Sequence, residues 1–448
     1  MLLADSLRTF RLDTHANDFD PRNLIYNKEV TLNRITTLYP YQLSNDNHTL
    51  NELYEIYRNF HILPDIFLAD CRPLDHTMSF SVDEYVIQKL PTSYMDQALA
   101  DGFLVEVHGI HWKHFEVIYG ILGYSNISKI DFEHNLSTKQ FNYERPKYYY
   151  AERYDKKVLL LCVAPGQDYL VHYSNLIKHF IKLRTTKPDI LKVFWYPLAE
   201  QSLPFWTGIN NELIMPGDRI ILGYVGEFNK LLDEELSCLL ISRYENSYFC
   251  ISRYKLNDSF VCLLGVKFSF WGCISAKLVS HLCQLGCSEI IYAAKLGALS
   301  STEDLYNKVF SPTKYLILRH NQILGEICDV KNPIADLFPE INTGWHVSVP
   351  TVLEENYQQR EIINRYHALS IDNEISQMAL AISNYNKEKL KAVTFVPLHF
   401  ATDYVRDIPE RLHNVLFDLS NNRSFQAIEA KNLVLDKLFT YLLAYLKL

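Results

Sequence analysis

The sequence contains little glycine, with 15 glycines among 448 residues, whereas it contains 30 tyrosines. It also lacks the short motifs of several large enzyme classes. No G-x-G-x-x-G follows an apolar run, and no phosphate-binding G-K-[S/T] loop, G-x-S-x-G elbow or H-E-x-x-H helix occurs. These absences remove the commonest enzyme classes that are recognised by such motifs.

Positive charge is also in short supply. The chain carries 44 Lys and Arg against 52 Asp and Glu, a net charge of −8, and it has no basic block or stripe. Binding to nucleic acid depends on a positively charged surface. We therefore expect no nucleic acid partner.

The cysteines form no disulfide framework in the sequence. There are nine of them, none in a C-x-x-C pair, and most lie in apolar runs, as Cys262 and Cys283 do. Buried free thiols in a reducing compartment fit this pattern. The N-terminal stretch MLLADSLRTFRLDTHANDFD has no apolar core of the secretory type. We therefore expect a cytoplasmic protein.

Long hydrophobic runs are missing. The longest, LVLDKLFTYLLAYLKL at the C-terminus, is interrupted by Asp436 and Lys437 and is too short to span a bilayer. We expect no membrane span here and interpret the run as a docking helix.

The length of the chain favours two domains. Residues 1–150 show mostly helical periodicity with strand-like pieces, which predicts a separate α+β N-terminal domain whose role the sequence does not indicate. Residues 151–190 hold a strand, the turn Pro165-Gly166 and a helix leading to a further strand, which is typical of a βαβ connection. Residues 191–448 form the second domain.

Apolar runs with strand character dominate this second domain. They include RIILGYV, SFVCLLGVKFS, SEIIYAAKLGAL, KYLILRH and AVTFVPLHF, and helical patterns such as AKLVSHLCQLG alternate with them. Continuous apolar strands are typical of sheets that are covered on both faces. The pattern predicts an α/β fold with three layers and a central mixed sheet.

One carboxylate in this region is oddly placed. In SIDNEISQMALAIS, residues 370–383, either Ser370 or Asp372 is expected to cap a helix. Helical spacing puts Glu374 on the same face as Met378 and Ile382, which should be buried. A carboxylate on a buried face needs a partner. Glu374 is therefore either a residue at the rim or one that holds a ligand.

The histidines of VHGIHWKHF suggest a metal site only at first sight. His108, His111 and His114 are spaced too broadly to converge on one ion, and no cysteine or acidic ligand motif completes the set. We expect no metal and no other cofactor.

Charged residues and glycines recur beside the apolar strands. Gly217 precedes RIILGYV, Lys295 and Gly297 end SEIIYAAKLGAL, Glu374 follows RYHALSIDN, and Asp403 follows AVTFVPLHFAT. Ligands of α/β proteins collect where loops leave the carboxyl ends of strands. These residues are the candidate site.

The order of these pieces resembles the nucleoside phosphorylase and nucleosidase superfamily. CSEIIYAAKLGAL is similar to its buried strand and glycine turn, VSVPTVLEE and SIDNE to the segment that presents a glutamate to ribose, and TFVPLHFATDY to its late strand ending in an aspartate. The resemblance covers residues 190–448 and implies cleavage of the N-glycosidic bond of a purine nucleoside or nucleotide. It also implies a homo-oligomer.

The resemblance assigns roles to the candidate residues. Glu374 would bind the ribose hydroxyls and Asp403 would assist the departing base. Gly297 and Gly217 would let the backbone approach the sugar or a phosphate. Asn373 stands where the family has a methionine against the ribose. Lys295 is similar to a lysine of AMP nucleosidase and would serve a nucleotide phosphate.

Departures from the family leave alternatives open. Tyr292 stands where many phosphorylases have an arginine, and only Gly272 remains of an expected pair of glycines. Without that arginine, attack by water is favoured over attack by phosphate. A non-catalytic protein that binds a nucleotide or a protein partner is the second hypothesis, and an activity held within residues 1–190 is the third.

Overall fold

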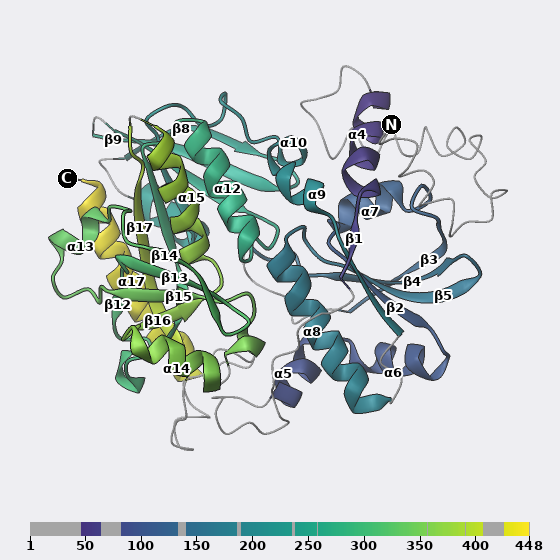
Figure 1. Cartoon of the computed structure of the whole chain (residues 1–448). Coiled ribbons are helices and arrows are strands. Elements are labelled where there is room, and N and C mark those ends of the chain that lie inside the picture. Colours follow the sequence, from purple (N-terminus) through teal and green to yellow (C-terminus); the bar gives the residue numbers. More distant parts are fainter. Residues whose placement is uncertain are drawn as a thin grey trace.

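The fold was analysed in a computed structural model of the whole chain (Figure 1). The structure describes residues 46–63, 82–132, 140–185, 190–234, 238–257, 259–355, 357–389, 391–405 and 425–447. Cys71 and the N-terminal stretch expected to lack a signal sequence fall outside these residues.

The first sheet is built from residues 61–195. Its strand order is β1-β6-β2-β5-β4-β3. The central strands β6, β2 and β5 are parallel, and the outer pairings are antiparallel. The strands are β1 (His61–Ile62), β2 (Leu104–His108), β3 (Tyr124–Ile130), β4 (Lys147–Arg153), β5 (Lys156–Cys162) and β6 (Leu191–Trp195).

Helices cover both faces of this sheet. The alternation within β5 shows this, because Leu159 and Leu161 pack into one core cluster and Leu160 and Cys162 into another. The helices α5 (Val82–Lys89), α6 (Thr92–Ala100) and α8 (Gln167–Arg184) contribute to the first cluster. The second cluster takes residues from α4 (Asp46–Arg58), α7 (Trp112–Ile118), α9 (Pro197–Gln201) and α10 (Leu203–Thr207).

The second sheet begins at residue 219 and has the order β14-β13-β15-β16-β11-β7-β10-β9-β8, with β17 paired to β11 and β12. Its core is parallel, because β7 pairs in parallel with β10 and β11, and β11 pairs in parallel with β17. The strands are β7 (Arg219–Gly223), β8 (Cys238–Glu245), β9 (Phe249–Leu256), β10 (Ser259–Val266), β11 (Glu289–Ala298), β12 (Val309–Phe310), β13 (Lys314–Arg319), β14 (Gln322–Ile327), β15 (Trp345–Ser348), β16 (Ser370–Asp372) and β17 (Thr394–Tyr404).

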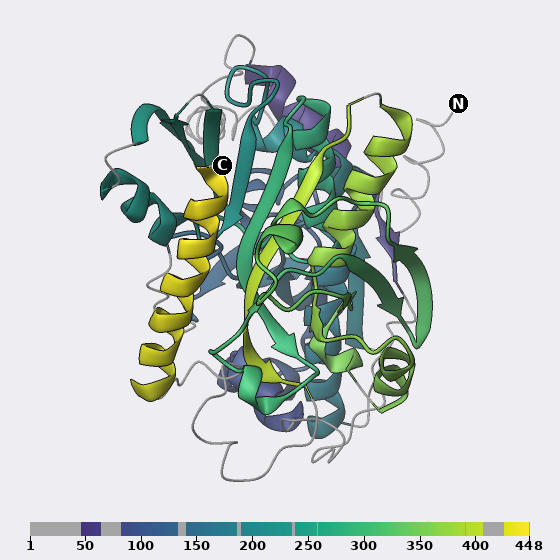
Figure 2. The same ribbon diagram turned by 90° about the vertical axis from the view of Figure 1, so that its left-hand side faces the viewer.

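Helices lie on both sides of the second sheet as well (Figure 2). On one side α12 (Cys273–Gln284) packs against α15 (Ile375–Glu388), and on the other α17 (Phe425–Leu446) contacts β17 and β12. The remaining helices are α11 (Val225–Glu234), α13 (Pro333–Leu337) and α14 (Tyr357–Arg365), with short 3-10 turns η2 (Thr302–Asp304) and η3 (Val352–Glu354). The predicted three-layer α/β fold with a central mixed sheet is confirmed.

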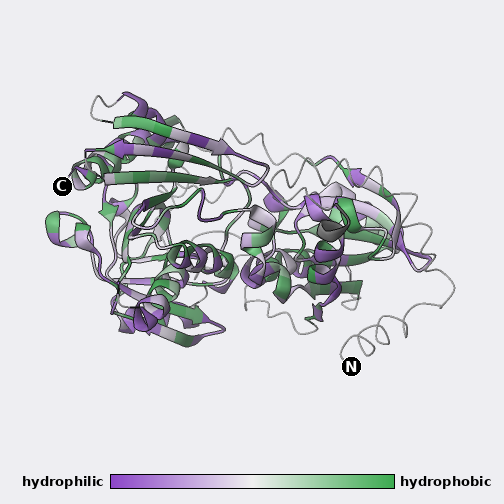
Figure 3. Ribbon diagram, turned by 90° about the horizontal axis from the view of Figure 1, so that it is seen from above, coloured by the Kyte–Doolittle hydropathy of each residue, from purple (hydrophilic) through white to green (hydrophobic). Residues whose placement is uncertain are grey.

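The helices carry both hydrophilic and hydrophobic residues along their length (Figure 3). The C-terminal run forms α17, whose Leu438 and Leu442 are fully buried, as expected of a docking helix. Among the described residues, none of the helices has the length and apolar character needed to cross a membrane.

The hydrogen-bonded sheet changes between β6 and β7, while one core cluster runs from residues of α4 to residues of α17. The βαβ unit β5-α8-β6 belongs to the first sheet, since β5 and β6 both pair in parallel with β2. The division of the chain into folding units at residues 150 and 190 stays a prediction.

Candidate functional site

The carboxyl ends of β7, β10, β11 and β17 meet at one edge of the second sheet, because these strands are parallel. At the end of β7 the chain turns sharply at Gly223, which has φ +97°. The N–H of Tyr224 donates to the carbonyl oxygen of Ala293 at 2.8 Å. A Cβ on Gly223 would lie 1.9 Å from that same oxygen, so the turn requires glycine.

Asp372 caps the helix that follows this edge. Its carboxylate accepts hydrogen bonds from the N–H of Ile375 at 3.0 and 3.2 Å, which makes it the cap of α15 that the sequence offered together with Ser370. Ser370 instead bonds Nδ1 of His346 at 2.8 Å.

His346 and Ser348 hold Asp372 in its charged form. Oδ1 of Asp372 lies 2.7 Å from Nε2 of His346 and accepts a hydrogen bond from the Ser348 hydroxyl at 2.6 Å. Burial alone would raise the pKa of Asp372, but the neighbouring His346 and these two hydrogen bonds lower it below its usual value. Asp372 is therefore a buried anion.

Glu374 lies beside this anion, directly before the first residue of α15, and makes no capping bond of its own. Its pKa is raised well above the usual value, first by burial and then by the charge of Asp372. The pKa values of the two neighbouring carboxyl groups are thus moved in opposite directions, downward for Asp372 and upward for Glu374. Neighbouring acids with pKa values pushed apart are typical of sites that move protons.

Tyr292 and His399 close this group from the sheet side. Their rings lie 4.8 Å apart, and the Tyr292 ring also lies 5.9 Å from that of Phe270. Burial, followed by the charges of Glu374 and Asp372, raises the pKa of Tyr292 well above its usual value. Burial lowers the pKa of His399 to about 3, and its ring nitrogens have no hydrogen-bond partner among the described residues.

Asp403 lies on the neighbouring strand and faces Gly297. The two residues pair across β17 and β11, just after an irregularity in the register at Leu296. A Cβ on Gly297 would lie 3.2 Å from Oδ2 of Asp403, so the glycine leaves room for the carboxylate.

Glu355 links Asp403 with the Asp372 group. It is 5% exposed, and its pKa is raised well above the usual value, first by burial and then by Asp403 and Asp372, with Arg360 acting in the opposite direction. Asp372 influences both Glu355 and Glu374, so these carboxyl groups surround a single region at the carboxyl edge of the sheet.

Asp168 brings a further carboxylate to this region from the first sheet's helix α8. It is fully buried, pairs with Arg319 and raises the pKa of Glu374. Glu354 lies next to it, and burial raises the pKa of Glu354 to about 7.

The other predicted residues are placed as follows. The Asn373 amide donates to the carbonyl oxygen of Val349 at 2.6 Å, next to Glu374. Lys295 is half-buried on β11 and, by strand alternation, leaves it on the face opposite Tyr292.

Gly217 is not part of this group. It is exposed at the amino end of β7, where its N–H donates to the carbonyl oxygen of Gly286, near the C-terminal end of α12. The turn it forms starts the strand, whereas the ligand edge lies where the strand ends. Gly223, and not Gly217, lies at that edge, and the approach of Gly217 to a ligand stays a prediction.

Several residues of this group were missed from the sequence. Asp372 was assigned only a capping role, and Glu354 and Glu355 lay unremarked in VSVPTVLEE. The signal for Asp168 was its position after the turn Pro165-Gly166, at the carboxyl end of a buried strand.

The three histidines of the first part have different hydrogen-bond or ion-pair partners, although the rings of His111 and His114 lie 5.2 Å apart. His108 bonds Tyr196 at 2.8 Å, His111 pairs with Glu144 at 2.9 Å, and His114 bonds Tyr57 at 2.7 Å. Among the described residues, no cluster of histidine, cysteine and acidic side chains could hold a metal ion.

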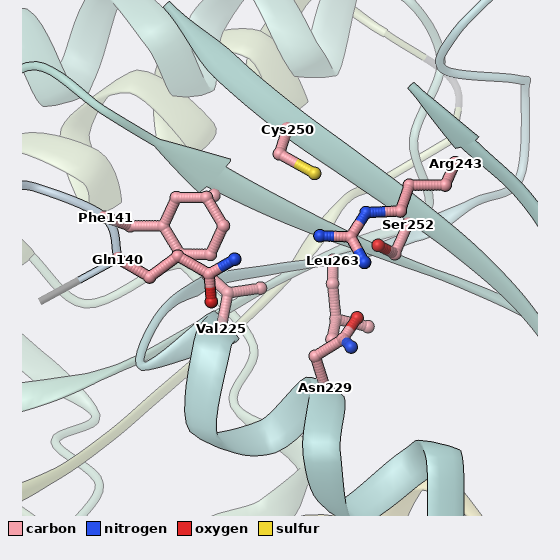
Figure 4. Close-up of a pocket in the computed structure, with 9 residues that line it drawn as sticks. Gln140, Phe141, Val225, Asn229, Arg243, Cys250, Ser252 and Leu263 are labelled. Carbon is pink, nitrogen blue, oxygen red and sulfur yellow. The ribbon is translucent and has the colours of Figure 1, made fainter. Parts of the chain in front are cut away.

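A small hollow lies between α11 and strands β8–β10 (Figure 4). It is a cavity of about 10 Å³, the room of about one water molecule. Arg243 and Cys250 point into it, and a hydrogen bond with the Cys250 thiol raises the pKa of Arg243. Phe141 closes it against Gly265, where a Cβ would lie 2.3 Å from the ring. The cavity is too small for a nucleoside.

No family model matches the chain. A curated relative, oxidoreductase cns1 of Cordyceps militaris, is 31% identical over 366 residues, which are 78% of this chain and 46% of that protein. The chain thus spans less than half the length of this relative.

Solved structures with some likeness include 5′-methylthioadenosine nucleosidase of Arabidopsis thaliana, which is 12% identical with a TM-score of 0.37 and covers 51% of this chain and 94% of that one. Purine nucleoside phosphorylase of Toxoplasma gondii is 13% identical with a TM-score of 0.37 and covers 52% and 92%. The 5′-methylthioadenosine/S-adenosylhomocysteine nucleosidase of Helicobacter pylori is 12% identical with a TM-score of 0.37 and covers 52% and 97%.

Proposed function

We propose that the chain cleaves the N-glycosidic bond of a purine nucleoside or nucleotide, with water as the attacking group. The observation that carries the proposal is Glu374, a carboxyl group placed at the start of α15 beside the buried anion Asp372 and close to the ends of the central strands. A structural helix cap would need neither the burial nor the raised pKa of Glu374, because Asp372 already caps the helix.

Glu374 would bind the ribose. A carboxylate accepts hydrogen bonds from two vicinal hydroxyl groups, and its charge favours the cation that develops on the sugar as the glycosidic bond breaks. Ribose hydroxyls that donate to Glu374 would lower its raised pKa, so that substrate binding would favour the charged form.

Asp403 would assist the departing base. A carboxyl group next to the base can donate a proton to its ring nitrogen when a partly buried site keeps the acid form populated. Asp403 is partly buried at the end of β17 and lies close enough to the buried Glu355 to affect its pKa.

Water is preferred over phosphate because Tyr292 takes the place of an expected arginine. A phenol held between Phe270 and His399 carries no positive charge for phosphate. Lys295, Asn373 and Gly297 would contribute to substrate binding. We also propose a cytoplasmic location and a homo-oligomer.

The alternative is a non-catalytic protein of the same fold that binds a nucleotide or a protein partner. The packing of Tyr292 favours it, because the ring fills space near Glu374 that a ligand would need.

The experiment is chromatography for free adenine, guanine or hypoxanthine after incubation with a panel of purine nucleosides and nucleotides, with and without phosphate. Release of base that does not require phosphate supports the proposal. Absence of release from every compound would contradict it, and calorimetric binding of a nucleotide without release would favour the alternative.

Asp403→Asn provides the test of the leaving-group role. The variant should lose at least 100-fold in the rate of base release, because general acid catalysis contributes about 100-fold or more. Nucleosides with a base that leaves without protonation should lose much less. Equal losses for both kinds of base would contradict the assignment.

A further inference from the structure

Asp168 crosses from the first sheet's side of the molecule into the candidate site. It is the second residue of α8 and is fully buried. It contacts Cys273, which follows β10, and Arg319, the last residue of β13. A buried carboxylate needs partners, and the structure provides them from both parts of the chain.

The partners of Asp168 are those of a bound anion. Its Oδ2 accepts a hydrogen bond from the N–H of Cys273 at 2.9 Å, at the first residue of α12, and its Oδ1 pairs with Nη2 of Arg319. Nη1 of Arg319 donates to Oε1 of Gln167 at 3.1 Å, which fixes the guanidinium in place. Asp168 also lies in the first turn of its own helix.

The carboxylate therefore lies where the N-termini of α8 and α12 meet beside an arginine. Helix N-termini carry partial positive charge and present free N–H groups, which is why they bind phosphate. Here the anion is a side chain of the protein.

The segment directly before α12 leaves room for the Asp168 side chain. Gly272 has φ +56°, and a Cβ there would lie 2.5 Å from Cβ and 2.6 Å from Oδ2 of Asp168. Any other residue at Gly272 would push the carboxylate away from the start of α12. The close approach and the hydrogen bond together show a fitted arrangement.

The charge of Asp168 reaches the catalytic candidates. It contributes to the raised pKa of Glu374 and of Glu354. Contacts also link the two positions, because Trp271, next to Gly272, donates from its indole N–H to the carbonyl oxygen of Pro350 at 2.9 Å, and Asn373, next to Glu374, donates to that of Val349 at 2.6 Å. An anion in the place of Asp168 would therefore lie near the same groups.

We propose that Asp168 is a built-in substitute for a phosphate ion: it fills the anion-binding position beside Glu374 and so excludes inorganic phosphate as the attacking group. The consequence for the reaction rests on the function proposed above. The claim that Asp168 occupies the anion position is independent of that function, because phosphate binding tests it without any reaction.

The test is binding of inorganic phosphate to the Asp168→Ala variant. Thermal unfolding and calorimetry both measure it. Removal of the carboxylate leaves Arg319 and the N–H of Cys273 without their anion, so the variant should unfold at a lower temperature than the wild type. Inorganic phosphate should raise that temperature by several degrees more than potassium chloride of equal ionic strength. The wild type should show no such difference.

Controls separate the anion position from general effects. Asp168→Asn removes the charge but keeps the space filled, so phosphate should not raise the unfolding temperature of this variant. Asp218→Ala removes an equally buried carboxylate, which pairs with Arg253 at 2.7 Å before β7, where no helix begins. Phosphate should raise the unfolding temperature of Asp218→Ala much less than that of Asp168→Ala. Asp168→Ser is the substitute if Asp168→Ala fails to fold. Its hydroxyl can still accept a hydrogen bond from the N–H of Cys273, while Arg319 loses its carboxylate. Phosphate should raise the unfolding temperature of this variant too.

Three results would overturn the proposal: specific binding of phosphate by the wild type, no phosphate effect on the folded Asp168→Ala or Asp168→Ser, or an equal effect on Asp218→Ala. Failure of base release by the wild type would leave these binding results unchanged. A wrong catalytic function and a wrong role for Asp168 can thus be told apart.

Discussion

At the scale of single residues, the candidate site depends on carboxyl groups whose pKa values are moved in opposite directions. His346 and Ser348 lower the pKa of Asp372, whereas burial and the Asp372 charge raise the pKa of Glu374. Residue type and spacing alone drew attention to Glu374 and Asp403. They did not single out Glu355, and for Asp168 they offered only its position after a buried strand, because the partners of those residues come from distant parts of the chain.

Glu354 allows a test by pH. Its pKa is raised from 4.5 to about 7, so it is protonated in the folded protein at pH values where it ionises in the unfolded chain. Its contribution to stability is fully present below about pH 4.5 and is lost as pH rises through 7. A shift of this size corresponds to about 3 kcal/mol.

Urea unfolding measured from pH 4 to 8 checks this prediction. In Glu354→Gln, which cannot ionise, the fall in the free energy of unfolding toward pH 8 should be smaller by about 3 kcal/mol than in the wild type. Parallel curves for the two proteins would show that Glu354 has an ordinary pKa.

At the scale of helices and strands, apolar periodicity predicted much of the second sheet. SEIIYAAKLGAL is β11, AVTFVPLHF begins β17 and AKLVSHLCQLG lies in α12. The sequence predicted less well which glycine lies at the carboxyl edge of the second sheet. Gly217 precedes β7 and Gly223 ends it, and only the parallel pairing shows that β10 and β11 end at the same edge as Gly223.

Gly272 links the two parts of the molecule at this scale. Gly272→Ala should destabilise the protein by about 3 kcal/mol or more, because it combines overpacking against Asp168 with a positive φ.

Gly217→Ala is the matched control for Gly272→Ala. Gly217 also has a positive φ, of +92°, but an added Cβ would meet nothing within 4 Å. It should therefore lose only about 1 kcal/mol. Equal losses in urea unfolding of the two variants would contradict a close contact at Gly272.

At the scale of the whole molecule, the two sheets share a core. Trp206 of α10 is fully buried, and its ring lies 5.4 Å from His114 in the first part and 5.3 and 5.1 Å from Tyr248 and Phe268 in the second. The sequence indicated two domains from length alone, and it could not show that aromatic residues from both would pack around one tryptophan.

This shared core predicts cooperative unfolding. Urea transitions followed by circular dichroism and by tryptophan fluorescence should coincide, because neither part can lose Trp206 without exposing the other. Trp206→Phe should shift both transitions together by about 1–3 kcal/mol. A wild type that unfolds in two separate steps would contradict the shared core.

The most direct test of the central claim is the rate of free base release by Glu374→Gln. The variant keeps the size of the side chain and should fold, but it should release base at least about 100-fold more slowly than the wild type. Glu289→Gln, at the amino end of β11, alters a buried carboxyl group away from the site and should keep the wild-type rate within a few fold. Base release by folded Glu374→Gln at the wild-type rate would contradict the assignment of Glu374 to the ribose.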